Sequence, residues 1–358
     1  MPYLSAPDAI SPAIQRTRTF LFRPFRFGTY LKLCLVALLT EGFGSNFNSS
    51  GGRGFSSRHR HTAYSPPSFH LTHEWVAAAI AMGLLVILLC FFLFYLITRL
   101  RFAYFHCLIH NTREIRPGWH LYRSQAARFF WMNLVVGFCF LLLVLLIALP
   151  FGAGFLRLIR ATQAGGHPSI SQVLALLLPL IPLILLLVLL AIAVDLVLRD
   201  FMLPHYALEN ATARQAWSAV WARMATEKAP FFVYALLRVI LPIVALIGLF
   251  IVLILPAILF FVVVIAVEVA MHAAFSGATG AAQFLGIFLQ VLIGFVAFVM
   301  AALAGICLGG PLSTAVREFA LIFYGGRYKP LGDTLYPPPP PAPPIPPPQI
   351  IPPAPAIS

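Results

Sequence analysis

Long apolar runs divide this chain, and short polar segments separate them. Five runs cover Trp75–Ile97, Phe129–Pro150, Val173–Leu198, Phe231–Leu255 and Phe284–Leu308. A helix needs about 20 apolar residues to cross the hydrocarbon core of a bilayer, so each run is long enough for one crossing. A shorter run, Phe27–Gly44, carries Lys32 near its start and Glu41 near its end. The pattern predicts an all-α, polytopic transmembrane helical bundle with about six spans.

Composition supports this fold class. The chain has 358 residues, of which 60% are hydrophobic and only 10% are charged. So few charged residues cannot cover the surface of a soluble domain of this size. We therefore expect membrane lipids as partners and no nucleic acid. A second copy of the chain or another membrane protein is a further candidate partner.

The distribution of basic residues predicts the orientation. We count the short run, Phe27–Gly44, as the first of six. Seventeen of the 24 Lys and Arg fall in four segments, one before this first run and the others after the second, fourth and sixth runs. Lys and Arg next to a span resist translocation, so these four segments and both termini are expected in the cytoplasm. The short run must then cross the membrane, because otherwise the segment from Arg99 to Arg128 would be external.

One apolar stretch leaves the number of spans open. From Phe231 to His272 the chain is almost wholly apolar over 42 residues, which is about 63 Å of helix at ~1.5 Å per residue. Two short spans meeting near Pro256 would give seven helices. Alternatively, one span runs to about Leu255 and is broken at Pro256, which leaves the rest lying outward or folded back.

An internal repeat favours six spans. Similar motifs follow the second, fourth and last runs, namely Arg101-Phe102, Arg199-Asp200-Phe201 and Arg317-Glu318-Phe319. We interpret the chain as three helical hairpins, over residues 14–100, 101–198 and 199–316. The predicted domains are a basic-aromatic lead-in (1–28), the transmembrane domain (29–316) and a cytoplasmic segment (317–335). A flexible external loop (45–73) and a disordered Pro-rich tail (336–358) complete the organisation.

Amphipathic segments precede the later hairpins. Thr212-Ala-Arg-Gln215 fits a capping box that would start a helix. The candidate lipid-interface residues combine Trp rings with Arg side chains, as in helices that lie at the membrane surface; they are Arg113, Arg116, Trp119, Arg123, Arg214, Trp217 and Trp221. Anchoring is the simpler interpretation, and selective binding of anionic lipid is the sharper one.

Polar residues inside the runs are candidates for function, because they are costly in a bilayer. Asp195 can pair with Arg199, four residues on, and Arg238 could reach Asp195. Glu268 and Gln290 lie in the last hairpin. We expect structural pairing for Asp195 and Arg238, although Arg238 could also extend to the membrane interface, and we expect Glu268 to be interfacial. The alternative is a transport pathway around Arg238 between two proline-broken helices, which contain Pro179 and Pro182 or Pro242 and Pro256.

The last run has a stripe of small residues, which recur every four positions at Ala297, Ala301, Gly305 and Gly309. Such spacing lets another helix approach closely, and Gln290 could hydrogen-bond across the contact. We expect packing within the chain in preference to homodimerisation.

The sequence contains none of the common catalytic, phosphate-binding or haem-binding motifs. Four histidines fall in the loop over residues 45–73, but its Gly- and Ser-rich composition fixes no geometry for them. We therefore expect no enzymatic activity, no cofactor and no metal site. The Pro-rich tail is expected to be an extended spacer.

Three motifs resemble a known group of proteins. They are Phe20-x-Phe22-x-Pro24-Phe25, Asp200-Phe201-x-x-Pro204, and Glu209 followed by Ala216-Trp217. In these motifs the chain resembles uncharacterised bacterial polytopic membrane proteins and is similar to the membrane domain associated with glycerophosphodiester phosphodiesterases. The resemblance covers residues 14–330 and implies a place in the bacterial cytoplasmic (inner) membrane. The phosphodiesterase activity of that group belongs to a separate catalytic domain, which we do not expect here.

The function predicted from the sequence is therefore that of a non-catalytic integral membrane protein. A scaffold or accessory role, with association of anionic lipid, fits the basic-aromatic segments. A small transporter or permease around Arg238 is the alternative.

Overall fold

The computed structural model describes residues 4–42, 73–163, 169–277 and 279–337, and every regular element in these ranges is a helix. The shorter elements are α1 (Ile10–Phe22), α2 (Phe27–Ala37), η1 (Leu38–Gly42), α5 (Ile115–Leu121), η2 (Val197–Met202), α8 (Leu203–Leu208), α9 (Ala213–Thr226) and α12 (Lys329–Leu335). The long helices are α4 (His73–His110), α6 (Arg123–Gln163), α7 (Ile170–Leu196), α10 (Lys228–Phe275) and α11 (Ala281–Gly325). The expected all-α class is confirmed.

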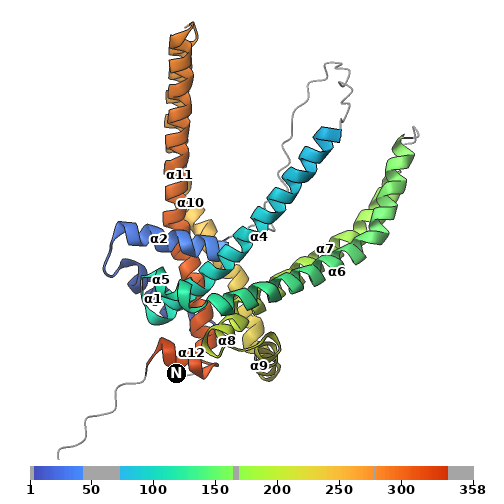
Figure 1. Ribbon diagram of the computed structural model, residues 1–358, viewed down its shortest axis with the longest axis vertical. Helices are drawn as coiled ribbons and strands as arrows, with labels where there is room; N and C mark the ends of the chain where they lie inside the picture. The colour runs from blue at the N-terminus through green and yellow to red at the C-terminus, as the bar shows by residue number, and fades with distance from the viewer. Residues whose placement is uncertain (1–3, 43–72, 164–168, 278, 338–358) are drawn as a thin grey trace, which may run out of the picture.

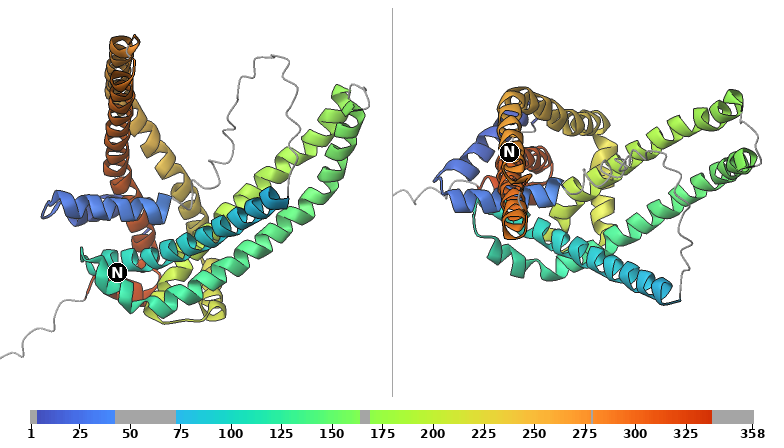
Figure 2. Two further views of the ribbon diagram at one scale, coloured as in Figure 1. Left: turned by 45° about the horizontal axis from the view of Figure 1, so that its top comes forward. Right: turned by 90° about the horizontal axis from the view of Figure 1, so that it is seen from above.

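The helices form a packed base from which three arms diverge (Figure 1). The base consists of all the shorter elements together with the ends of the long helices that reach them. The arms are the remaining parts of the long helices: α4 alone, the hairpin α6–α7 and the hairpin α10–α11. Figure 2 shows that the three arms point in different directions.

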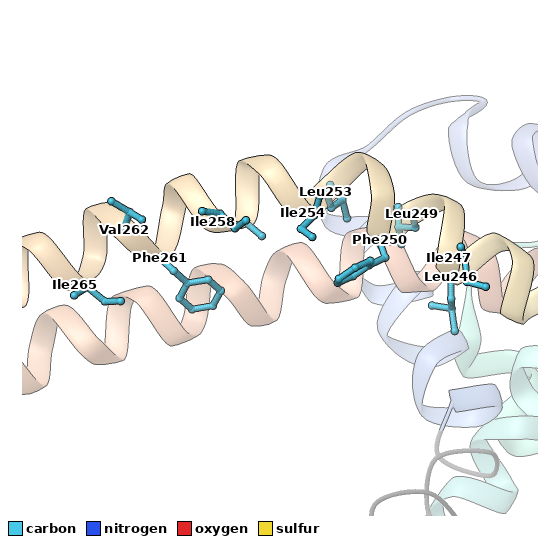
Figure 3. A pocket seen from close by; sticks show the side chains of 11 residues that line it. Leu246, Ile247, Leu249, Phe250, Leu253, Ile254, Ile258, Phe261, Val262 and Ile265 are labelled. Atoms are coloured by element: carbon cyan, nitrogen blue, oxygen red, sulfur yellow. The ribbon is translucent and has the colours of Figure 1, made fainter.

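The arms are apolar and exposed. The described residues include five helices that are long and apolar enough to cross a membrane, and the most apolar window of each has no buried residue. Figure 3 shows one such surface on α10, which is lined only by apolar side chains between Leu246 and Ile265. Apolar surface of this extent is stable only in contact with lipid or another apolar partner. The chain is therefore an integral, multi-pass membrane protein.

The base has the aromatic core that the arms lack. Phe102, Phe201 and Phe319, the phenylalanines of the three Arg-containing motifs, are all buried there. The ring centroid of Phe201 lies 5.0 Å from that of Tyr324 on α11 and 5.1 Å from that of Phe231 on α10. The motifs thus bring the ends of α4, α7 and α11 together in one core.

The proline-containing helices are not interrupted in the structure. Pro242 and Pro256 both lie inside α10, which continues over 48 residues, and Pro179 and Pro182 lie inside α7. The expected break at Pro256 and the two proline-broken helices are therefore not observed. A proline removes only one backbone donor, and in lipid the remaining groups have no partner other than the helix itself, which favours its continuation.

The first predicted span is described only in part. Its residues 27–42 are helical, as α2 and η1, which corresponds to about 24 Å at ~1.5 Å per residue. A hydrocarbon core is about 30 Å thick. Figure 1 shows α2 lying across α11 instead of alongside it. The residues after Gly42 lie outside the described part of the chain, so a sixth crossing stays a prediction.

The two terminal helices lie in the base. Nη1 of Arg16 on α1 donates to the carbonyl oxygen of Leu335 on α12 at 3.3 Å. Both ends of the described chain are therefore on the same side of the arms (Figure 1).

The proposed repeat has a local counterpart in the backbone. Asn111 and Asn210 each stand nine residues after the phenylalanine of their motif, and both adopt positive φ angles, 51° and 53°. Asparagine is among the few residues that tolerate this conformation, which here follows a helix end. The three-unit interpretation itself stays a prediction, as do the domain boundaries. The predicted loop and tail lie almost wholly outside the described residues.

Candidate functional site

Charged side chains meet at the point where the three arms leave the base. We call this group the vertex cluster, and its members come from six elements. They are Glu41 (η1), Arg101 (α4), Asp195 (α7), Arg199 and Asp200 (η2), Tyr234 and Arg238 (α10) and Arg317 (α11).

Asp200 is the centre of the vertex cluster. Its Oδ1 accepts a hydrogen bond from Nη1 of Arg317 at 2.9 Å. Its Oδ2 accepts from Nε of Arg238 at 2.9 Å and from the hydroxyl of Tyr234 at 2.8 Å. Asp200 and Arg317 are both only 1% exposed. One carboxylate therefore connects η2 to both helices of the α10–α11 arm.

Glu41 provides the second buried carboxylate. Its Oε2 lies 3.2 Å from Nη2 of Arg238 and 3.7 Å from Nη1 of Arg199, and its Oε1 lies 3.7 Å from Nε of Arg317. These contacts hold η1 against the arms. Each buried ion keeps its charge here because partners replace the water that it has lost.

Arg199 connects two of the arms. Its Nη2 donates to Oδ1 of Asp195 at 3.1 Å, which is the pair expected from their i,i+4 spacing. Its backbone carbonyl accepts from Nη1 of Arg317 at 2.9 Å. Arg238 differs from the expectation, because it pairs with Asp200 and Glu41 instead of Asp195. Asp200 lies one turn further into the base, where burial makes its charge the stronger attraction for Arg238.

Arg101 is the exception in the cluster. Its Nη2 donates to the backbone carbonyl of Thr40 at 3.1 Å. Its Nε is buried without a hydrogen-bond partner. Among the described residues, no carboxylate lies at salt-bridge distance from its guanidinium. The cluster contains four arginines but only three carboxylates, so it has one positive charge without a partner.

A second polar group lies deeper in the base around His205 on α8. Its Nε2 lies 2.8 Å from the hydroxyl of Tyr324 and 3.3 Å from Nη1 of Arg223. A guanidinium can only donate, so Nε2 accepts and the ring proton lies on Nδ1. That proton is donated to Glu209, whose Oε2 is 3.0 Å away. Partial burial opposes ionisation of Glu209 and is the largest single influence, but the hydrogen bond from His205, the Tyr328 hydroxyl and the charge of Arg223 together outweigh it and hold the pKa of this carboxyl below its usual range.

The predicted interface residues on α9 are placed on the outside of the base. The capping box is present, since Oγ1 of Thr212 accepts from the backbone of Gln215 and the Gln215 side chain accepts from that of Thr212. Ala216 and Val220 face the core. Trp217 and Trp221 are 49% and 61% exposed, and their rings stack with centroids 6.1 Å apart. Arg214 is exposed on the same helix.

The other four predicted interface residues fall into two groups. Arg116 and Arg123 are exposed. Nη2 of Arg113 instead donates to the carbonyl of Phe20 at 2.7 Å and also to that of Arg23, at the end of α1. The Trp119 ring lies under the guanidinium of Arg99, 4.2 Å from the ring centroid. Arg113 and Trp119 are therefore engaged within the protein.

The predicted residues of the last hairpin do not join the vertex cluster. Glu268 and Gln290 are half-buried along the α10–α11 arm, where Oε1 of Glu268 lies near Gly294. Of the small-residue stripe, Ala297 is half-buried, whereas Ala301 and Gly305 are exposed and a Cβ at Gly305 would meet nothing within 4 Å.

The close helix contact is instead made at the end of the stripe. A Cβ at Gly309 would lie 3.0 Å from Leu38, and one at Gly310 would lie 2.2 Å from Cβ of Cys34 on α2. The packing expected for the whole stripe is thus formed only at its base-proximal end, because the arms diverge above that point.

Several members of the two polar groups were not singled out from the sequence as site residues. They are Glu41, Asp200, Tyr234 and Arg317 in the vertex cluster, and His205, Glu209, Arg223 and Tyr324 around the histidine. One signal was available, since Asp200 and Arg317 both belong to repeated Arg-containing motifs. The partners of a buried charge cannot be read from spacing when they come from different helices.

These observations define the class of the protein as an all-helical, multi-pass membrane protein with a buried ion-pair cluster at the origin of its arms. The chain belongs to a family of unknown function, DUF7544, whose model matches residues 4–333. No curated protein and no solved structure matches it. Within the described residues, no group of three or more His, Cys, Asp or Glu side chains is arranged to hold a metal ion.

Proposed function

We propose that this protein is a non-catalytic membrane scaffold whose base lies on the cytoplasmic side and associates with anionic lipids. The basic residues that concentrate in the base-proximal segments support this orientation, because anionic lipids attract Lys and Arg near the cytoplasmic surface. The resemblance to membrane domains associated with glycerophosphodiester phosphodiesterases agrees with a role as a non-catalytic membrane module.

The observation that carries the proposal is the outer face of α9. Trp217 and Trp221 stack on each other and remain exposed next to Arg214, although the same helix packs its other face into the base. On a surface that faces water, such an exposed tryptophan pair would be costly to hydrate. The headgroup region of a bilayer accommodates both the indole rings and the guanidinium. Arg113 does not belong to this lipid-facing set, because its guanidinium donates to a backbone carbonyl of the protein.

The experiment is native mass spectrometry of the purified protein after titration with phosphatidylglycerol in mild detergent. A triple variant, Arg214→Gln with Trp217→Ala and Trp221→Ala, should retain fewer phosphatidylglycerol molecules than the parent. The control is Arg157→Gln with Arg160→Gln, because both arginines are exposed at the opposite end of α6. The proposal fails if the triple variant retains as much lipid as the parent, or if the control loses as much as the triple variant.

Transport around Arg238 has weaker support. Arg238 donates to Asp200 and Glu41, so the guanidinium that would serve a substrate is already bound within the protein. Solute flux into proteoliposomes that disappears in Arg238→Lys, while the variant remains folded, would favour the permease instead.

A further inference from the structure

We propose that Arg101 binds the phosphate of an anionic phospholipid whose acyl chains fill the space between the diverging arms. This inference rests on the proposed lipid association but assigns it to one site and one kind of headgroup. It also differs from general surface attraction, because the site is at the vertex of the arms and not on the outer face of α9.

Charge balance points to an anion at this position. Glu41 and Asp200 lie among Arg199, Arg238 and Arg317, and Asp195 neutralises the remaining charge of these three arginines. The nearby pair of Arg16 and Glu318, whose Nε and Oε2 are 3.2 Å apart, adds no net charge. Arg101 is left as the uncompensated cation of the cluster. A partly buried charge without a counter-ion is costly, and a phosphodiester would supply the missing negative charge.

The guanidinium of Arg101 also has an unoccupied hydrogen-bond donor. Nη2 is bonded to the carbonyl of Thr40, and Nε is buried. Nη1 has no hydrogen bond to any described residue and is not among the buried orphan atoms. One N–H group of a half-buried arginine is therefore accessible, and arginine forms charge-assisted hydrogen bonds to phosphate oxygens.

The surroundings select a lipid over a free anion. Arg101 directly precedes the buried stretch Phe102–Phe105 of α4, and the apolar windows of α4, α7, α10 and α11 contain no buried residues. The diverging helices do not cover one another, so acyl chains must occupy the space between them in a bilayer. A phospholipid satisfies both parts of the site, with its phosphate at Arg101 and its chains along the arms. Inorganic phosphate satisfies only the first.

The test uses the full-length protein, stripped of lipid in detergent and then titrated while bound lipid is counted by native mass spectrometry. Phosphatidylglycerol and phosphatidylcholine with identical chains separate net headgroup charge from chain binding, and inorganic phosphate tests the anion alone. Arg101→Gln should weaken the tightest phosphatidylglycerol binding by about tenfold or more, as expected for the loss of one charged hydrogen bond. Arg101→Lys should lose less affinity for phosphatidylglycerol, because the positive charge remains.

Stability provides a second readout. In the delipidated protein, Arg101→Gln removes an unpaired, half-buried cation together with its hydrogen bond to Thr40, so its melting temperature should stay close to that of the parent. In the presence of phosphatidylglycerol the parent should gain more thermal stability than the variant. A lower melting temperature of the delipidated variant would show a structural role for Arg101 and would overturn the proposal.

The possible results separate this site from the proposed function. Unchanged phosphatidylglycerol binding in Arg101→Gln, together with loss in the α9 triple variant, rejects the site and retains the scaffold proposal. Unchanged binding in both rejects both. Equal affinity for phosphatidylcholine and phosphatidylglycerol, or binding of inorganic phosphate as tight as that of the lipid, also overturns the inference.

Discussion

The base and the arms distribute charged and apolar side chains in opposite ways between the interior and the surface. In the base Arg317 is 1% exposed and makes ion pairs, whereas in the α10–α11 arm Leu255 is 75% exposed. A water-soluble protein would show the reverse. The contrast shows that the two regions have different solvents. The base folds by burying aromatic rings and paired charges, and the arms rely on lipid to cover their apolar side chains.

The comparison also locates the stability of the fold. Helices α10 and α11 contact each other along the arm, but most of their apolar side chains gain nothing from leaving water for a protein core, because lipid is equally apolar. The interactions that fix the relative positions of the arms are those of the base. Substitutions in the base should therefore have large effects, and matched substitutions in the arms should have small ones.

The largest effect is expected at Asp200. Asp200→Ala removes the shared acceptor of Arg238, Arg317 and Tyr234 and leaves two buried guanidinium groups without it. Loss of one partner of a buried ion pair costs about 3–5 kcal/mol. Thermal unfolding in detergent should show a large fall in melting temperature or no folded protein at all.

Asp195→Ala is the matched control for that substitution. The Asp195 side chain is 50% exposed and makes a single i,i+4 pair, which is worth about 0.3–0.5 kcal/mol. A control as unstable as Asp200→Ala would mean that burial does not distinguish the two carboxylates.

A pair of phenylalanines compares the two regions directly. Phe201→Ala, in the aromatic core, should reduce the free energy of unfolding by about 3–5 kcal/mol. Phe250→Ala, on a 65% exposed side chain of α10, should reduce it by less than about 0.5 kcal/mol in detergent or lipid. Chemical denaturation of both variants in the same micelles measures the difference. Equal losses would show that the arms pack against protein in the membrane.

The sequence was sufficient to predict the arms but not the base. Runs of about 20 apolar residues identify membrane helices because the thickness of the bilayer sets their length, and all five long runs fall in long helices. The i,i+4 pair of Asp195 and Arg199 and the capping box at Thr212 were also predictable, because both are local.

The vertex cluster was not predictable, because its contacts join residues far apart in the chain. Glu41 and Arg238 are separated by 197 positions, and periodicity carries no information on which helix ends meet. The small-residue stripe shows the same limit. Its spacing suits a helix contact throughout, but of its members only Gly309, next to Gly310, lies where α2 and η1 cross α11.

A smaller effect is expected at that crossing. A Cβ at Gly310 would stand 2.6 Å from the Cα atom of Cys34, so Gly310→Ala must displace the α2 backbone. Such overpacking costs about 1–3 kcal/mol. Gly305→Ala is the control, because its Cβ would meet nothing within 4 Å and alanine favours a helix over glycine by about 1 kcal/mol. Melting temperatures should therefore move in opposite directions. A loss in both variants would place a further helix against Gly305, as in a dimer.

The smallest effect concerns Glu209, at the edge of the base. Its depressed pKa means that the folded state favours the ionised carboxylate, so its stabilising contribution is present above the usual carboxyl pKa of about 4.3 and is lost as the pH falls through the lower, folded value. The side chain is 45% exposed, so the contribution should stay below about 1 kcal/mol. Glu209→Gln should melt slightly below the parent at pH 6, and the gap should close below about pH 4. A gap that persists into acid would assign the loss to packing instead of to charge.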